Sequence, residues 1–229
     1  MKKIFTLIAV ALCAMSASAQ GTFTYALGDA VGSDVTSVTG ITLSYSAEGT
    51  WAAASAQANY ADADFANYTK GNNISGKFTE GSAPTGCWYK FAPTVSGTLT
   101  VGVALNGAKS FYVVKGSNFT ALPIADITPN LPSEAGGASQ TFDTSNNQVA
   151  EKSYGTVTFS VTANETYYVF CTGSKLGFYG FKFTTGTAGI DQTETIDDNA
   201  TPQFTVAGQP INGSYKGIII QKGKKFVNK

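Results

Sequence analysis

Histidine and arginine are both missing from the 229-residue sequence, so lysine supplies all 15 basic side chains. Their absence excludes Ser-His-Asp and Cys-His nucleophile systems, histidine-ligated zinc and bidentate arginine clamps. The 15 acidic residues balance the lysines, and no basic patch stands out in the middle of the chain. Nucleic acid is therefore not an expected partner. No motif in the sequence predicts a cofactor or a metal ion.

Cysteine is scarce, with three residues in the chain and none in a CxxC motif. Two of them, Cys87 and Cys171, fall within stretches of strand-like alternation. Cys87 shares a predicted strand face with Tyr89, and Cys171 shares one with Val169, so both thiols are expected to point into a core. A disulfide between them in an oxidising compartment and two buried free thiols are the two alternatives.

Long apolar runs are also missing, because the longest, residues 4–12, is too short for a membrane span of about 20 residues. It follows Lys2 and Lys3 and precedes Ala17-Ser18-Ala19, which is the order of a cleaved secretory signal peptide. We therefore expect residues 1–19 to be a signal peptide. The protein would be secreted or held at the outer cell surface, and would not be an integral membrane protein. Cys13 raises the alternative of a lipid anchor, but the Leu before it stands where a small residue is usual.

Apolar and polar residues alternate from residue 22 to residue 184, which is the period of half-buried antiparallel strands. About nine short strands without a helical period are typical of a β-sandwich. The sequence therefore predicts an all-β fold, an antiparallel and jelly-roll-like sandwich over residues 20–185. The expected strands lie near residues 23–27, 41–45, 73–78, 87–92, 99–105, 110–115, 157–161, 166–172 and 178–184.

Two stretches break this alternation. Residues 51–64 are rich in alanine and predict a loop or one or two helical turns, which makes them a candidate rim of a binding site. Asp62 and Asp64 in this stretch have a spacing that calcium sites use, but no loop of further oxygen ligands completes the set. Residues 123–152 predict a long connection between strands.

Aromatic residues are concentrated in residues 167–181, where two strands flank a short Gly-Ser-Lys turn. Together with residues 87–91, 97–101 and 111–113, this stretch resembles non-catalytic β-sandwich modules of secreted polysaccharide-degrading enzymes. The resemblance covers residues 67–184 and rests on structural positions more than on chemical ones. It implies carbohydrate binding.

Exposed aromatic rings would carry such a function, because the C–H faces of sugars stack on them while polar side chains bind the hydroxyl groups. Strand alternation places Trp88 and Lys90 on the face opposite Cys87, Tyr89 and Phe91, and it places Phe178 and Lys182 on the face opposite Tyr179, Phe181 and Phe183. The residues expected in the core are Tyr167, Phe170, Phe181 and Phe183. Trp51 is a candidate because it lies in the irregular stretch. The ligand-binding candidates are Trp51, Trp88, Lys90, Phe178 and Lys182. Most aromatic residues of a sandwich are core residues, which is the alternative for each ring.

The composition changes after residue 185. Residues 186–202 are acidic, contain few apolar residues and are typical of a flexible linker. Residues 203–229 form a lysine-rich unit with a Gly-Gln turn, an apolar strand and a Gly-Lys-Lys turn. These features involve Gly208, Gln209, Lys216, Gly217, Gly223, Lys224 and Lys225.

This unit is similar to the C-terminal sorting domain of type IX secretion substrates, type A, in a short form. The resemblance implies one partner, the type IX secretion machinery, and a route across the cell outer membrane to the surface. Pro210 departs from the family pattern, in which a basic residue usually follows the Gly-Gln turn. The alternative is a small hairpin that packs on the sandwich.

The sequence thus predicts a secreted or cell-surface carbohydrate-binding protein that is not an enzyme and has a polysaccharide or glycoconjugate as its ligand. A surface adhesin or structural protein without glycan binding is the second hypothesis. A carboxylate-dependent hydrolase is the third, and it requires two acids that the fold brings together.

Overall fold

The computed structural model describes residues 20–25, 33–46, 48, 50–54, 65, 68–72, 74–186, 203–209, 211, 216–221 and 224–228. The predicted signal peptide, Asp62 and Asp64 lie outside these residues, as does nearly all of the predicted linker. The chain divides into two compact units, Met1–Thr187 and Ala188–Lys229. Each unit is described by itself.

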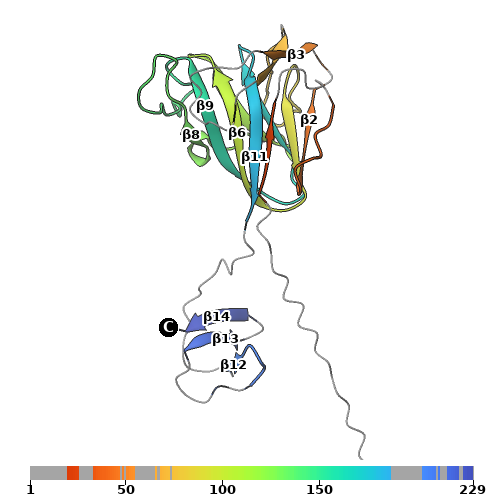
Figure 1. Cartoon of the computed structure of the whole chain (residues 1–229), viewed down its shortest axis with the longest axis vertical. Helices are drawn as coiled ribbons and strands as arrows, with labels where there is room; N and C mark the ends of the chain where they lie inside the picture. The colour runs from red at the N-terminus through yellow and green to blue at the C-terminus, as the bar shows by residue number, and fades with distance from the viewer. Residues whose placement is uncertain are drawn as a thin grey trace, which may run out of the picture. The chain divides into compact units, whose positions relative to one another are not determined.

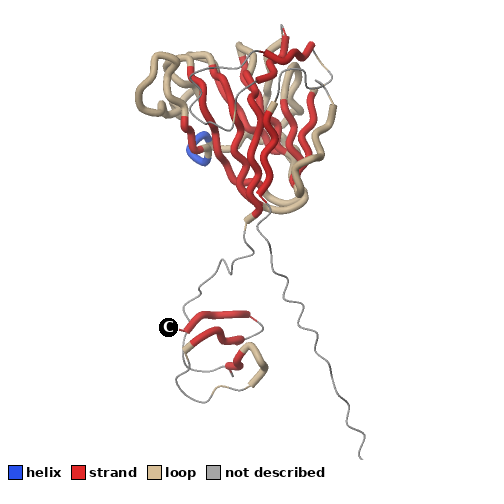
Figure 2. Tube along the Cα trace, viewed as in Figure 1, coloured by secondary structure: helices blue, strands red, loops and turns tan. Residues whose placement is uncertain are grey.

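The first unit is a sandwich of two antiparallel sheets, as Figures 1 and 2 show. Six strands of the seven-stranded sheet follow the order β3-β4-β11-β6-β9-β8. The seventh strand, β1, pairs with β11 on the same edge as β4 but with other residues of β11. Its strands are β1 (Gln20–Thr24), β3 (Thr50–Ala54), β4 (Tyr68–Asn72), β6 (Gly97–Leu105), β8 (Thr128–Asn130), β9 (Ser153–Val161) and β11 (Gly177–Thr185). The four-stranded sheet has the order β2-β5-β10-β7, with β2 (Ile41–Tyr45), β5 (Tyr89–Pro93), β10 (Tyr167–Thr172) and β7 (Ser110–Lys115).

The predicted all-β antiparallel sandwich is confirmed. The described residues contain no α-helix and one short 3₁₀ turn, η1 (Ile124–Asp126). The turn and strand β8 interrupt the connection predicted for residues 123–152. The strand predicted at residues 73–78 is not formed: β4 ends at Asn72, and Gly76 and Lys77 each form an isolated bridge.

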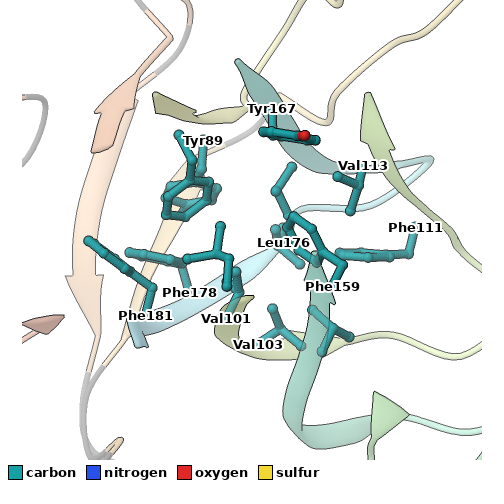
Figure 3. Close-up of a cluster of buried hydrophobic side chains, with 14 of the residues drawn as sticks. Tyr89, Val101, Val103, Phe111, Val113, Phe159, Tyr167, Leu176, Phe178 and Phe181 are labelled. Carbon is teal, nitrogen blue, oxygen red and sulfur yellow. The ribbon is translucent and has the colours of Figure 1, made fainter. Parts of the chain in front are cut away.

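Alternating residues of both sheets fill the space between them. On β6, Leu99, Val101 and Val103 are fully buried, while Thr98 and Thr100 face outward. Tyr89 of the opposite sheet stacks on Phe178 with ring centroids 4.3 Å apart, and Figure 3 shows these rings within the core cluster. Each such side chain contributes about 1.5–3 kcal/mol when it leaves water, so this core supplies most of the stability of the fold.

Strand β11 carries a bulge at Tyr179, where its register with β6 shifts between Phe178 and Gly180. The extra residue reverses the alternation, so Phe178 and Phe181 both enter the core while Tyr179 lies on the outer face. The prediction that Phe178 faces away from the core is therefore wrong. A β-carbon at Gly180 would collide with the carbonyl oxygen of Phe23, which explains the glycine.

The second unit is a three-stranded antiparallel sheet with the order β12-β13-β14, formed by β12 (Gln203–Thr205), β13 (Gly217–Gln221) and β14 (Lys224–Asn228). Ile219 and Phe226 face each other across β13 and β14, and both are buried. Ile218 and Val227, the neighbouring pair on the opposite face, are exposed. The unit thus has a small core on one face and apolar side chains on the other.

Candidate functional site

The outer face of the four-stranded sheet carries aromatic rings that the core between the sheets does not use. Strand register aligns Ser44, Lys90, Tyr168 and Val114 in one row across β2, β5, β10 and β7. Trp88, just before β5, meets Tyr168 edge to face with ring centroids 5.0 Å apart. All these side chains except Val114 are half-buried, so they lie within reach of a ligand.

Phe119 extends this surface from the loop that follows β7. Its ring centroid lies 6.3 Å from that of Tyr168. We call Trp88, Tyr168 and Phe119 the aromatic platform. Burial raises the pKa of the Tyr168 hydroxyl, so the group remains a protonated hydrogen-bond donor at neutral pH.

The backbone of Trp88 is fixed by Ser46 of the neighbouring segment. The Trp88 N–H donates to Ser46 Oγ at 3.3 Å, and the Trp88 carbonyl accepts from the Ser46 N–H at 3.1 Å. No hydrogen bond of the Trp88 indole N–H is found within the described part of the chain. The Trp88 backbone is therefore anchored while the indole N–H is available to a ligand.

A pocket of about 350 Å³ lies where these two segments continue past Ser46 and Trp88, and its size is near the lower end for small-molecule sites. Gly86 donates its N–H to Glu48 Oε2 at 2.5 Å, which ties the two segments together. Lys77 and Thr85 exchange two backbone hydrogen bonds of 2.9 and 3.1 Å on another wall. The lining residues are Glu48, Ile74, Ser75, Lys77, Thr85 and Gly86.

Gly86 is needed where it stands because its φ is +80° and a β-carbon would collide with the carbonyl oxygen of Ser75. The pocket carries one charge of each sign, the carboxylate of Glu48 and the ammonium of Lys77. The ion pair found among the described residues joins Lys152 Nζ to Glu134 Oε1 at 2.9 Å. Glu48 and Lys77 are therefore not paired with each other.

The two cysteines are buried free thiols in this structure, which is one of the two alternatives that the sequence left open. Burial raises the pKa of Cys171 to about 12. Burial, and next the charge of Glu48, raise the pKa of Cys87, whose Sγ lies 3.5 Å from the Glu48 carbonyl oxygen. Both thiols are therefore protonated at neutral pH and are poor nucleophiles.

The structure brings together only two of the predicted ligand-binding residues, Trp88 and Lys90. Trp51 lies in strand β3 and not in an irregular segment, and its ring packs on Tyr45 and Tyr89 at centroid distances of 5.4 and 4.9 Å. Its indole N–H donates to the Ser46 carbonyl at 3.1 Å. Trp51 thus packs on the core from a regular strand, and the prediction of an irregular segment at this position is wrong.

Phe178 and Lys182 also lie outside the candidate site. Phe178 is fully buried and cannot stack on a sugar. Lys182 projects from the outer face of the other sheet, where its Nζ lies 5.4 Å from the ring centroid of Phe65. The sandwich core therefore separates Lys182 from Trp88 and Lys90.

Sequence reasoning did not select Tyr168, Phe119, Glu48 or Lys77. Strand alternation could have identified Tyr168, because its neighbours Tyr167 and Val169 are core residues. No local sequence pattern could have identified the pocket, because its walls come from three segments that are distant in the sequence.

The part of the chain that the structure describes contains no group of three metal-ligating side chains. It also contains no helix with the length and apolar character needed to cross a membrane. The fold and the surface thus define a β-sandwich protein with an aromatic outer face beside a small polar pocket. Neither a model of a known protein family nor a curated protein matches this chain.

Proposed function

We propose that the protein is a non-catalytic carbohydrate-binding protein that holds its ligand on the aromatic platform. The observation that carries this proposal is the half-buried pair Trp88 and Tyr168 on the outer face of a sheet, with Lys90 beside Tyr168 in register. A sugar ring presents a flat C–H face that stacks on such rings. The Lys90 ammonium and the Tyr168 hydroxyl then bind hydroxyl groups at the edge of the sugar.

The pocket beside the platform supports binding more than hydrolysis. Glycoside hydrolysis requires two carboxyl groups about 5–9.5 Å apart across the scissile bond. Glu48 is the one carboxylate among the residues that line the pocket. A single acid can bind a hydroxyl group but cannot divide the acid and base roles with a partner.

Affinity electrophoresis of the full chain through gels that contain single polysaccharides tests this function. We expect at least one plant or host polysaccharide to retard the protein, and we expect Tyr168→Ala and Lys90→Ala to reduce the retardation. Lys182→Ala is the matched control, because it removes a lysine from the outer face of the other sheet. Equal migration with and without every polysaccharide of a broad panel would favour the adhesin hypothesis instead.

We further propose that the protein reaches the cell surface by a cleaved signal peptide at residues 1–19 and a type IX sorting signal at residues 203–229. The separate compact unit at Ala188–Lys229, with its own buried pair Ile219 and Phe226, supports a detachable tail. Among the described residues of the resemblance, Gly217, Lys224 and Lys225 lie on β13 and β14, and Lys216 directly precedes β13.

The intact mass of the protein recovered from the envelope of a type IX-competent cell tests this route. We expect the loss of residues 1–19 and of the C-terminal unit, and we expect a chain truncated before residue 203 to remain in the periplasm. A surface-exposed protein that keeps residues 203–229, or efficient export of the truncated chain, would contradict the sorting proposal.

A further inference from the structure

We infer that the pocket beside the aromatic platform binds a single uncharged sugar residue, so that the protein selects neutral glycans over glycans that carry carboxylate or ammonium groups. This inference rests on the proposed carbohydrate-binding function and specifies its ligand class. It depends on three features of the pocket: its distance from the platform, its hydrogen-bonding groups and its balanced charge.

The pocket continues the platform along the same two segments. Ser46 and Trp88 are joined by hydrogen bonds, and Glu48 and Gly86 are joined by the next interaction along the same pair of segments. Gly86 precedes Trp88 by two residues, which span at most about 7 Å, so the pocket wall lies within about the length of one sugar residue of the Trp88 backbone. A glycan that stacks on the platform can therefore place a neighbouring residue in the pocket.

The hydrogen-bonding groups of the pocket suit a polyhydroxyl ligand. The Glu48 carboxylate can only accept, and Oε2 already receives the Gly86 N–H, so Oε1 can accept from a ligand. The Lys77 ammonium can only donate. Neighbouring hydroxyl groups of one sugar can donate to Glu48 and accept from Lys77, while the hydroxyls of Ser75 and Thr85 can do either.

The charge of the pocket is balanced and its two charged groups are not paired with each other. A uronate or sulfate placed in the pocket would bind Lys77 but would be repelled by Glu48. The ammonium group of an amino sugar would bind Glu48 but would be repelled by Lys77. A neutral sugar satisfies both groups without repulsion, which makes the pair a filter against charged ligands.

The pocket is also held in shape before a ligand arrives. Lys77 and Thr85 form a two-bond bridge, and Gly86 contacts the Ser75 carbonyl so closely that no side chain fits between them. A preformed site loses little entropy on binding and keeps the spacing of its charged groups, which a selective site requires.

Two matched pairs of oligosaccharides test the inference by titration calorimetry on the full chain. One pair is fully methyl-esterified oligogalacturonate and its de-esterified form, and the other is an N-acetylated chito-oligosaccharide and its deacetylated form. Each pair shares a backbone and differs in charge. We expect the neutral member of at least one pair to bind about tenfold or more tightly than its charged partner.

Two variants connect this preference to the pocket. Glu48→Gln keeps an acceptor for Gly86 but leaves Lys77 as an uncompensated cation, so the ratio of affinities for the esterified and de-esterified oligomers should shift toward the anionic form by about tenfold. Lys77→Met should weaken the neutral ligand and shift the ratio in the opposite direction. Circular dichroism and the thermal midpoint confirm that both variants are folded.

The outcomes separate the two proposals. Unchanged affinities and ratios in both variants, with binding lost in Tyr168→Ala, would overturn the pocket inference and leave the proposed function standing. Tighter binding of the charged member of each pair by the unaltered protein would also overturn the inference. Failure of these oligosaccharides and of the whole polysaccharide panel to bind would overturn the proposed function together with the inference.

Discussion

The two outer faces of the sandwich differ in chemistry although they belong to one core. On the outer face of the seven-stranded sheet, a row of four threonines and one lysine crosses five strands: Thr22, Lys182, Thr100, Thr158 and Thr128. The aromatic rings of this face, Phe65, Tyr154 and Tyr179, are buried in a cluster of their own. The outer face of the four-stranded sheet presents the platform rings. We call the first the hydroxyl face.

Hydration and strand propensity account for the composition of one of these faces but not of the other. Threonine is favoured in strands and is well hydrated, and the Thr100 and Thr158 hydroxyls lie 2.9 Å apart in a hydrogen bond. The hydroxyl face therefore needs no explanation beyond solubility. The half-buried rings of the platform leave apolar surface in contact with water, and the proposed glycan would cover that surface.

The largest effect is expected from Phe178→Ala, because the bulge in β11 places Phe178 in the core and not on a face. The variant should lose about 3–5 kcal/mol of unfolding free energy in guanidinium denaturation. Lys182→Ala, four residues further on the hydroxyl face, should change stability by less than about 1 kcal/mol. Similar small losses in both would contradict the register of β11.

A smaller effect is expected where the pocket wall needs glycine. Gly86 and Gly81 both have φ near +80°, but a β-carbon has open space at Gly81 and collides with the Ser75 carbonyl at Gly86. Both alanine variants should pay about 1 kcal/mol for the backbone conformation. Gly86→Ala should lose about 1–3 kcal/mol more and should weaken glycan binding. Equal unfolding free energies would show that the wall is not tightly packed.

The buried thiol of Cys171 predicts a pH dependence of stability. Its pKa is about 12 in the folded state against 9.0 for a thiol in water, so the unfolded chain loses this proton first as pH rises. The free energy of unfolding therefore falls as pH rises above 9. Denaturation between pH 8 and 10 should give a less steep decline for Cys171→Ala than for the unaltered chain, and parallel curves would contradict the assignment.

The smallest effect is expected on the hydroxyl face. Thr100→Val removes one partner of the Thr100–Thr158 hydrogen bond but keeps a β-branched side chain on the strand. Stability should change by less than about 1 kcal/mol, and migration in the polysaccharide gels should stay the same. A loss of retardation in this variant would place glycan binding on the hydroxyl face.

Strand alternation was sufficient to predict the sandwich and much of its core. The pattern of Leu99, Val101 and Val103 is regular, and these side chains are all buried. Alternation also placed Trp88 and Lys90 on the outer face correctly. It worked in these strands because each residue simply opposes one residue of the neighbouring strand.

The errors have specific physical causes. A bulge reverses the faces of a strand without any sequence pattern that marks it, which is why Phe178 was misplaced. Trp51 was assigned to an irregular segment because its alanine-rich surroundings lack the alternation of apolar and polar residues that marks a strand. The pocket depends on Glu48, Lys77 and Gly86, which meet only after the segments around them have folded together, so the local sequence could not predict it.

The most direct test of the central claim is hydroxyl-radical footprinting of the full chain with and without a polysaccharide that retards it. The account predicts that the ligand reduces oxidation of Trp88, Tyr168 and Phe119. Oxidation of Trp51, which packs on the core, and of Phe204, in the separate C-terminal unit, should remain unchanged. Unchanged oxidation of the aromatic platform with the polysaccharide bound would contradict the account.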